Sequence, residues 1–136
     1  MILVDLNVVL DVIQKREPHY ASSAALLDQV VRGSLRAVLP AHAFTTIHFI
    51  VSRYRDEAEA DGVVDWLLRH FDVAPVGRNE LLRARALGWK DFEDCVVAAS
   101  AESCGCDSIV TRNVRDFGRS PVPAVTPQEH QIGRAH

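Results

Sequence analysis

Short runs of consecutive apolar residues alternate along this chain with longer stretches in which apolar residues recur every three or four positions. A short apolar run bounded by glycine, proline or charged residues predicts a buried strand. We expect five such strands, at 2–5, 36–39, 73–76, 108–111 and 122–125. The last run follows Pro121 and contains Pro123, so we expect it at an edge of the sheet.

The stretches between these runs have the periodicity of helices. We expect a first helix capped by Asn7 and broken at Glu17-Pro18, and a later short helix capped by Asn79. Gly33, Gly88 and Gly105 are suited to end helices. The helices after the first are expected at 19–32, 41–53, 56–70, 79–87 and 91–104, with a last capped turn at 126–129.

This alternation of strands and helices predicts the fold class. Right-handed crossovers between successive strands produce a mainly parallel sheet with helices on both faces. We therefore predict an α/β fold, built as a three-layer α/β/α sandwich. A chain of 136 residues has room for one domain. We assign that domain to residues 1–132 and expect 133–136 to be a frayed end.

The composition is that of an ordinary globular protein, with 48% hydrophobic and 24% charged residues. No apolar run approaches the roughly 18 residues needed to cross a bilayer. The apolar start of the chain has no basic leader, so we expect no secretion signal. Cys95, Cys104 and Cys106 lack the spacing of a zinc site, and we expect reduced, mostly buried thiols in a cytoplasmic protein.

The net charge of −3 argues against a general binder of polyanions. Any contact with nucleic acid must therefore use local basic clusters or metal ions.

Acidic residues stand where the expected strands end and the helices begin. Asp5 ends the first strand, Asp91 and Asp94 open a helix, and Asp116 follows the fourth apolar run. In an open α/β sheet the carboxyl ends of the strands converge on one crevice. Clustered carboxylates repel one another, and a divalent cation is their usual neutralising partner. The pattern predicts a site for Mg²⁺ or Mn²⁺, of the kind that activates water and stabilises charge on a phosphate.

Each acid also has a plain structural interpretation. Asp5 could cap the helix that follows it, although Asn7 suits that task. Asp91 and Asp94 fit a capping arrangement supported by the helix dipole. Asp116 could be a solvated loop acid paired with a neighbouring arginine. The prediction of a metal site therefore rests on the joint placement of the acids at strand ends and helix starts.

Other chemistries find little support in the sequence. The six histidines are scattered, and we expect all of them to be structural or solvent-facing. The seven glycines stand alone and form no phosphate-binding loop. No serine lies in the context of a nucleophile elbow.

Four stretches, taken in order, resemble the PIN domain family, the small nuclease fold of VapC-like toxins. They are residues 2–11, 90–97, 109–117 and 125–129. The first contains Asp5, the second the run Asp91-Phe92-Glu93-Asp94, and the third Asp116. Each stretch alone is a weak pattern, whereas the ordered set covers nearly the whole chain.

The resemblance implies a metal-dependent endoribonuclease, with Asp5 and Asp94 as the principal ligands of Mg²⁺ or Mn²⁺. Asp116, or water held through Asn113, would complete that site. Thr111 and Asn7 would be supporting polar groups that orient the acids. Relatives of this type usually act as toxins beside a small antitoxin protein and commonly form homodimers, so the resemblance implies both kinds of partner.

The sequence departs from the family pattern at two places. Thr46 stands where many members have a glutamate, and Asn113 stands where they have another acid. Asp91, one helical turn from Asp94, is a candidate to compensate as a further metal ligand. The missing acids keep open an alternative, a PIN-like module that binds RNA or protein and has weak or no catalysis.

Three cations lie beside the acids in the sequence, namely Lys90, Arg112 and Arg115. They are candidates to hold the RNA backbone. Their alternative interpretation as solvated surface cations stays open.

Overall fold

In the computed structural model, which describes residues 1–135 without the side chains of residues 132, 134 and 135, five strands form one sheet. The strand order is β3-β2-β1-β4-β5, and every neighbouring pair is parallel. The strands are β1 (Ile2–Val4), β2 (Ala37–Pro40), β3 (Asp72–Ala74), β4 (Ser108–Val110) and β5 (Ala124–Val125). This sheet confirms the predicted α/β class, and β5 lies at an edge as expected.

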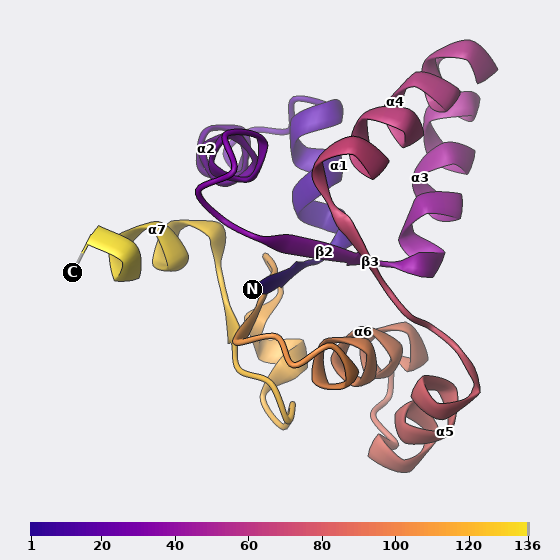
Figure 1. The fold of residues 1–136 in the computed structure, drawn as a ribbon, viewed down its shortest axis with the longest axis vertical. Helices are drawn as coiled ribbons and strands as arrows, with labels where there is room; N and C mark the ends of the chain where they lie inside the picture. Colours follow the sequence, from indigo (N-terminus) through magenta and orange to yellow (C-terminus); the bar gives the residue numbers. More distant parts are fainter. Residues whose placement is uncertain (136) are drawn as a thin grey trace.

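Helices cover both faces of the sheet (Figure 1). On one face lie α1 (Leu6–Ile13), α2 (Tyr20–Val31), α3 (Ala41–Tyr54) and α4 (Glu57–His70). On the other face lie α5 (Arg78–Leu87) and α6 (Phe92–Ser103). The 3₁₀ turn η1 (Val114–Phe117) follows β4, and the final helix α7 (Pro127–Ala135) contacts α2.

The pleat of the sheet divides the core into two layers. Ile2 and Val4 point into the cluster formed with the first four helices, whereas Leu3 between them packs against α6. The same alternation separates Val110 from Ile109 on β4. Because successive strand residues face opposite sides, a continuously apolar strand supplies both layers at once.

Two predicted helix caps are wrong by a small shift along the chain. Asp5, rather than Asn7, is the N-cap of α1, and its side chain accepts a hydrogen bond from the Leu6 amide. Gly77, rather than Asn79, precedes α5, where the Glu80 side chain accepts a hydrogen bond from the Gly77 amide. In both places the strand or loop ends earlier than the apolar pattern indicates.

The other differences concern the ends of elements. The capped turn predicted at 126–129 is the start of α7, where Thr126 and Glu129 exchange hydrogen bonds of 3.0 Å. This helix continues to Ala135, through most of the segment expected to be frayed, and His136 lies outside the described residues.

The strand order reverses direction between β1 and β4. The chain winds from β1 through β2 to β3 in one direction, and β4 and β5 lie on the opposite side of β1. Ligands of open α/β sheets bind at such a reversal, beyond the carboxyl ends of the strands. Here Asp5 follows β1 and Thr111 follows β4, so these two residues lie at the switch point.

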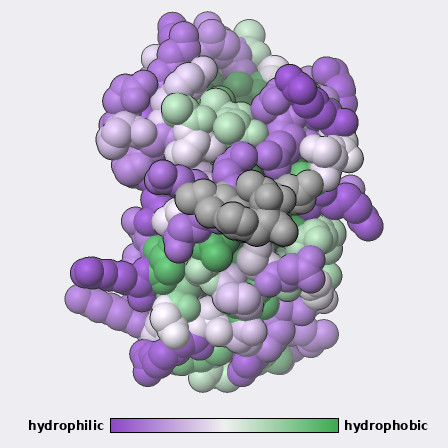
Figure 2. Space-filling view, turned by 90° about the vertical axis from the view of Figure 1, so that its left-hand side faces the viewer, coloured by the Kyte–Doolittle hydropathy of each residue, from purple (hydrophilic) through white to green (hydrophobic). Residues whose placement is uncertain are grey.

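The surface fits the mixed composition of the chain. On the face beside α7, hydrophilic residues cover much of the area and hydrophobic residues gather in small areas between them (Figure 2). Within the described residues, no helix is long and apolar enough to cross a membrane. The three cysteines are free thiols, with Cys95 and Cys106 buried and Cys104 partly exposed, as the sequence predicts.

Candidate active site

Asp5 is a buried carboxylate whose two oxygens are both engaged. The Leu6 amide donates a hydrogen bond of 2.8 Å to Oδ1, and the Thr111 hydroxyl donates one of 2.8 Å to Oδ2. Burial raises the pKa of Asp5, and these two hydrogen bonds oppose that rise only in part. The cap interpretation and the site interpretation of Asp5 are therefore compatible, because one side chain does both.

Asn7 and Thr111 connect the ends of β1 and β4. The Asn7 amide group donates hydrogen bonds to Asp5 Oδ2 at 3.4 Å and to Thr111 Oγ1 at 3.5 Å. The Asn113 amide donates to Thr111 Oγ1 at 3.1 Å, so Asn113 supports the loop through its backbone. These contacts place Asn7, Thr111 and Asn113 around Asp5, where supporting polar groups would fix the orientation of its carboxylate.

Asp94 lies in the first turn of α6, just after the N-cap Asp91. The Asp91 carboxylate accepts a hydrogen bond of 3.1 Å from the Asp94 amide, which satisfies one of the free amides of the helix start. Asp91 is therefore a helix cap. The Asp94 carboxylate is half-buried, and among the described residues it has no hydrogen-bond donor and no paired cation.

Burial raises the pKa of Asp94 from 3.8 to about 7. Negative charges add to this rise, in decreasing order those of Asp91, Asp5, Asp116 and Glu93. Acids from β1, η1 and α6 thus act electrostatically on one carboxylate, although they are remote from one another in the sequence. This coupling shows that the acids predicted from the strand ends do come together.

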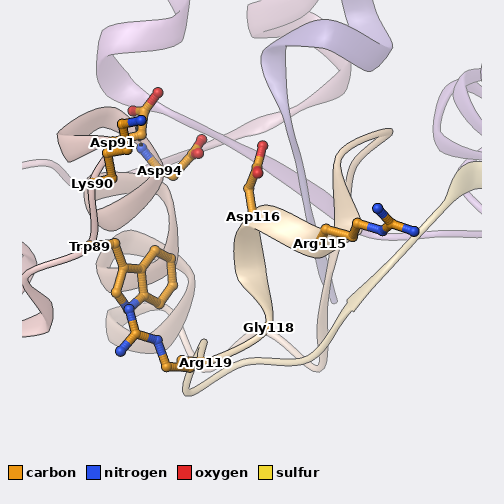
Figure 3. A pocket seen from close by; sticks show the side chains of 8 residues that line it. All are labelled: Trp89, Lys90, Asp91, Asp94, Arg115, Asp116, Gly118 and Arg119. Atoms are coloured by element: carbon orange, nitrogen blue, oxygen red, sulfur yellow. Dashed lines mark hydrogen bonds between the residues drawn. The ribbon is translucent and has the colours of Figure 1, made fainter.

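Asp91, Asp94 and Asp116 line one cavity of about 570 Å³. The carboxylates of Asp94 and Asp116 point toward the same space from α6 and from η1 (Figure 3). Three cations and an aromatic ring share the lining, namely Lys90, Arg115, Arg119 and Trp89. Asp5 lies outside this lining and acts on Asp94 through its charge.

The three predicted cations have different places. Lys90 and Arg115 line the cavity, and the guanidinium of Arg115 points away from the carboxylates of Asp94 and Asp116 (Figure 3). Arg112 does not line this cavity. Its Nε lies 3.1 Å from Asp11 Oδ2 on α1, in an ion pair that the sequence analysis did not foresee.

Thr46, which stands at the position of the missing glutamate, is engaged within its own helix. Its hydroxyl donates a hydrogen bond of 3.1 Å to the backbone carbonyl of His42, one turn earlier in α3. The side chain has no other hydrogen bond among the described residues, and it does not line the cavity of Asp94 and Asp116.

His42 and Glu93 are neighbours of the acids that sequence reasoning missed. His42 Nε2 lies 4.0 Å from Glu93 Oε1, and its positive form lowers the pKa of Asp5. His42 comes just after β2, the neighbour of β1, so it lies at the same edge of the sheet as Asp5. The rule that strand ends converge could have found it, had the rule been applied to histidine as well as to the acids.

The donor set suits a hard divalent cation. Among the described residues there is no ready-made group of three His, Cys, Asp or Glu side chains that could hold a metal ion. The acids around Asp94 nevertheless offer oxygen ligands, and their negative charges add to the effect of burial in raising the pKa of Asp94, which has no paired cation among the described residues. Mg²⁺ and Mn²⁺ prefer a few carboxylates and keep several waters, so an incomplete protein cage fits them.

The chain belongs to the PIN domain family, since the PIN domain model matches residues 1–115. This match contains the end of β1 with Asp5 and the start of α6 with Asp94, and it ends at Arg115, one residue before Asp116. No curated protein sequence matches the chain.

Solved structures with the same fold come from several bacteria. A toxin–antitoxin complex from Klebsiella pneumoniae has a chain of 19% identity and TM-score 0.71, with 93% of this chain and 98% of that chain covered. VapBC2 from Rickettsia felis, bound to a promoter DNA fragment, gives 16% identity and TM-score 0.72 at the same coverage, 93% and 98%. VapC20 from Mycobacterium tuberculosis, a toxin that cleaves the sarcin–ricin loop, gives 14% identity and TM-score 0.64, with 80% and 87% covered. At these identities the likeness shows a shared fold.

Proposed function

We propose that this protein is a metal-dependent endoribonuclease, acting as the toxin of a toxin–antitoxin pair. The observation that carries the proposal is the gathering of acids around the half-buried Asp94, where burial first and the neighbouring negative charges second raise the pKa of this carboxylate to about 7. A carboxylate that lies among other acids and has no paired cation among the described residues is suited to bind a cation from solution. VapC20, a protein of the same fold, is a toxin that cleaves the sarcin–ricin loop.

Asp5, Asp94 and Asp116 would hold Mg²⁺ or Mn²⁺, with Asp91 beside them as a further candidate. When bound, such an ion would supply an activated water and stabilise negative charge on a phosphate. The chain's own part is orientation: Thr111 and Asn7 donate to Asp5 Oδ2 and hold this carboxylate in one rotamer. Since Asp91 already caps α6, its carboxylate has one oxygen committed to the helix.

The basic rim would hold the RNA backbone beside these acids. Lys90, Arg115 and Arg119 line the same cavity as Asp94 and Asp116. Phosphate contacts from such cations position a nucleic acid without reading its sequence. His42 lies outside this lining, with its Nε2 4.0 Å from Glu93 Oε1.

Cleavage of labelled RNA tests this proposal. We expect the protein to cut single-stranded or hairpin RNA with Mn²⁺ or Mg²⁺ and to be inactive with EDTA. Asp5→Asn and Asp94→Asn should each lower the rate by at least about 100-fold. Asp65→Asn is the matched control, since Asp65 is exposed on α4, away from the cavity. Unchanged cleavage by both site variants would refute the assigned site.

A binding module without catalysis is the second candidate function. The neutral residues Thr46 and Asn113, at positions where acids are expected, favour it. Titration calorimetry with Mn²⁺ separates the two candidates, because a binding-only module should take up no Mn²⁺ at millimolar concentration. RNA binding without cleavage, together with no uptake of Mn²⁺, would establish this second function.

The proposed partners are a small antitoxin protein and a second copy of the chain. The Klebsiella and Rickettsia structures are toxin–antitoxin assemblies of the same fold, which supports an antitoxin partner. The homodimer and the cytoplasmic location follow from the resemblance and the free thiols as proposals. Light scattering of the purified chain, alone and co-expressed with the product of an adjacent gene, tests both partners.

A further inference from the structure

Asp11 is a fully buried carboxylate with its own cation. It lies on α1 with none of its surface exposed. The Ser23 hydroxyl of α2 donates a hydrogen bond of 3.2 Å to Asp11 Oδ2, and Arg112 Nε forms an ion pair with the same oxygen at 3.1 Å. Asp11 Oδ1 and Arg112 Nε have no hydrogen-bond partner among the described residues, so the charge of Arg112 is the main compensation. Burial of an ionised carboxylate is costly unless a cation and hydrogen bonds compensate it. The chain therefore supplies this site with an arginine from the end of β4, the strand that pairs with β1.

Arg112 stands at the root of the loop that carries Asp116. It follows Thr111, whose hydroxyl donates to Asp5, and its own backbone amide lies 3.4 Å from the Asn7 Oδ1 acceptor. Its side chain then reaches back to Asp11. Backbone and side chain of this one residue thus attach the point where the chain leaves β4 to helix α1.

The same loop has a second attachment at its other end. Phe117, the last residue of η1, is buried, and its ring packs edge-on against Trp89 at 5.9 Å between centroids. Asp116 lies directly before it. The loop is therefore held at Arg112 on one side of the sheet and at Phe117 on the other, with Asp116 exposed to the cavity between them.

We propose that the buried ion pair between Asp11 and Arg112 is a positioning device, which fixes the loop after β4 so that Asp116 faces Asp94. This inference rests on the proposed function for its catalytic consequence, whereas its effect on the loop is independent of catalysis. Arg112 is then a positioning residue and not a contact of the RNA backbone.

The energetics of buried pairs favour this assignment over a stabilising role. Replacement of a buried ion pair by apolar residues of similar volume is often neutral or stabilising, so stability alone does not explain the pair. A charged pair, however, has one register, whereas an apolar contact can slide. The loop needs such a register because η1 is a single 3₁₀ turn.

The test compares a double variant with the wild-type protein. Asp11→Leu combined with Arg112→Met removes both charges and leaves apolar side chains at both positions, and circular dichroism checks that the fold persists. Arg112→Met alone is the second variant. Arg83→Met is the matched control, because it breaks the ion pair of 2.8 Å with Glu102 on the surface of α5 and α6.

Two readouts follow the loop and the site separately. Hydrogen–deuterium exchange of residues 112–118 should accelerate by at least about tenfold in the double variant, while exchange in β1 and α6 stays unchanged. The affinity for Mn²⁺ by calorimetry should fall by about 10-fold or more. Arg83→Met should match the wild type in both readouts.

Two results would overturn the inference. If residues 112–118 of the double variant exchange hydrogen for deuterium at the wild-type rate, the ion pair does not order the loop. A raised KM for RNA, with unchanged exchange and Mn²⁺ affinity, would assign Arg112 to the substrate. If the wild-type protein neither binds Mn²⁺ nor cuts RNA, the proposed function fails, and the exchange experiment still decides whether the pair orders the loop.

Discussion

Asp11 and Asp94 are two carboxylates with opposite surroundings, since Asp11 is paired with a cation and Asp94 lies among other acids. Asp11 is fully buried, yet it has a hydroxyl donor and the guanidinium of Arg112. Asp94 is half-buried and faces other acids, which together with burial raise its pKa to about 7. The deeper carboxylate is the compensated one, so burial alone does not distinguish the two sites.

The difference teaches how a structural acid and a site acid are recognised. Where the fold uses a carboxylate for its own architecture, it supplies the opposite charge from within the chain. Where the opposite charge is to come from outside, the chain leaves the carboxylate among like charges. Removal of one charge should therefore destabilise the first site and stabilise the second in the metal-free protein.

The largest expected effect comes from breaking the compensated site. Arg112→Met leaves Asp11 buried without its cation, so we expect the free energy of unfolding to fall by about 3 kcal/mol. Urea denaturation at neutral pH measures this change. The double variant with Asp11→Leu should recover most of the loss, because no unpaired charge remains. Equal destabilisation in both variants would mean that packing, and not charge, holds this site.

Addition of Mn²⁺ to the uncompensated site should have the next largest effect. A ligand at 100 times its Kd stabilises the folded state by about 2.7 kcal/mol. We expect thermal unfolding of the wild-type protein to shift upward with Mn²⁺, and Asp94→Asn to lose most of this shift. If Mn²⁺ shifts the unfolding temperature of the Asp94→Asn protein by the same amount, the metal does not bind at Asp94.

The pH dependence of the metal-free protein sharpens the comparison further. The folded protein binds the Asp94 proton more tightly than the unfolded chain, since the pKa is about 7 against an ordinary 3.8. The protonated Asp94 carboxyl therefore contributes its full stabilisation below pH 3.8, and this stabilisation is lost as the pH rises through about 7.

Asp94→Asn should remove this pH dependence. In EDTA at pH 8 we expect this variant to be more stable than the wild type by about 1 kcal/mol, a value reduced for screening because water reaches the carboxylate. At pH 5 the difference should be smaller than at pH 8, since only part of the stabilising contribution of the Asp94 proton is then lost. Urea denaturation at both pH values measures the difference, with Asp65→Asn as control. A wild-type protein that is the more stable one at pH 8 would contradict the electrostatic account of this site.

The smallest effect should come from a charge pair that is exposed. Arg83 and Glu102 are paired at 2.8 Å on the surface, where solvent screens both charges. We expect no measurable shift of the urea midpoint for Arg83→Met. If Arg83→Met shifts the urea midpoint as much as Arg112→Met does, burial does not account for the large effect expected at Asp11.

The sequence predicted the sheet and the main acids because both depend on local patterns. Apolar runs mark the strands, and Asp5 and Asp116 follow from the position of the strand ends. The exact start of α1 was missed, because the apolar pattern extends to the cap and does not resolve one residue. Asp5, and not Asn7, therefore occupies the cap.

The ion pair of Asp11 and Arg112 could not be predicted in the same way. Asp11 looks like one polar position of an amphipathic helix, and Arg112 looks like a surface cation beside the acids. Their pairing depends on how α1 packs beside the end of β4, which only the three-dimensional arrangement fixes. His42 was missed for another reason: the six histidines are scattered along the sequence and were expected to be structural or solvent-facing, so the position of His42 at the end of β2 was not used.

Trp89 gives the cavity an optical signal of its own. The chain has two tryptophans, and Trp66 lies across the sheet on α4, whereas Trp89 lines the cavity and stacks edge-on against Phe117. In a Trp66→Phe background, the emission of Trp89 would therefore monitor occupancy beside Asp116 directly, and paramagnetic Mn²⁺ should quench it. The indole that closes the pocket wall could thus report ion uptake in real time, without a label and without any substrate.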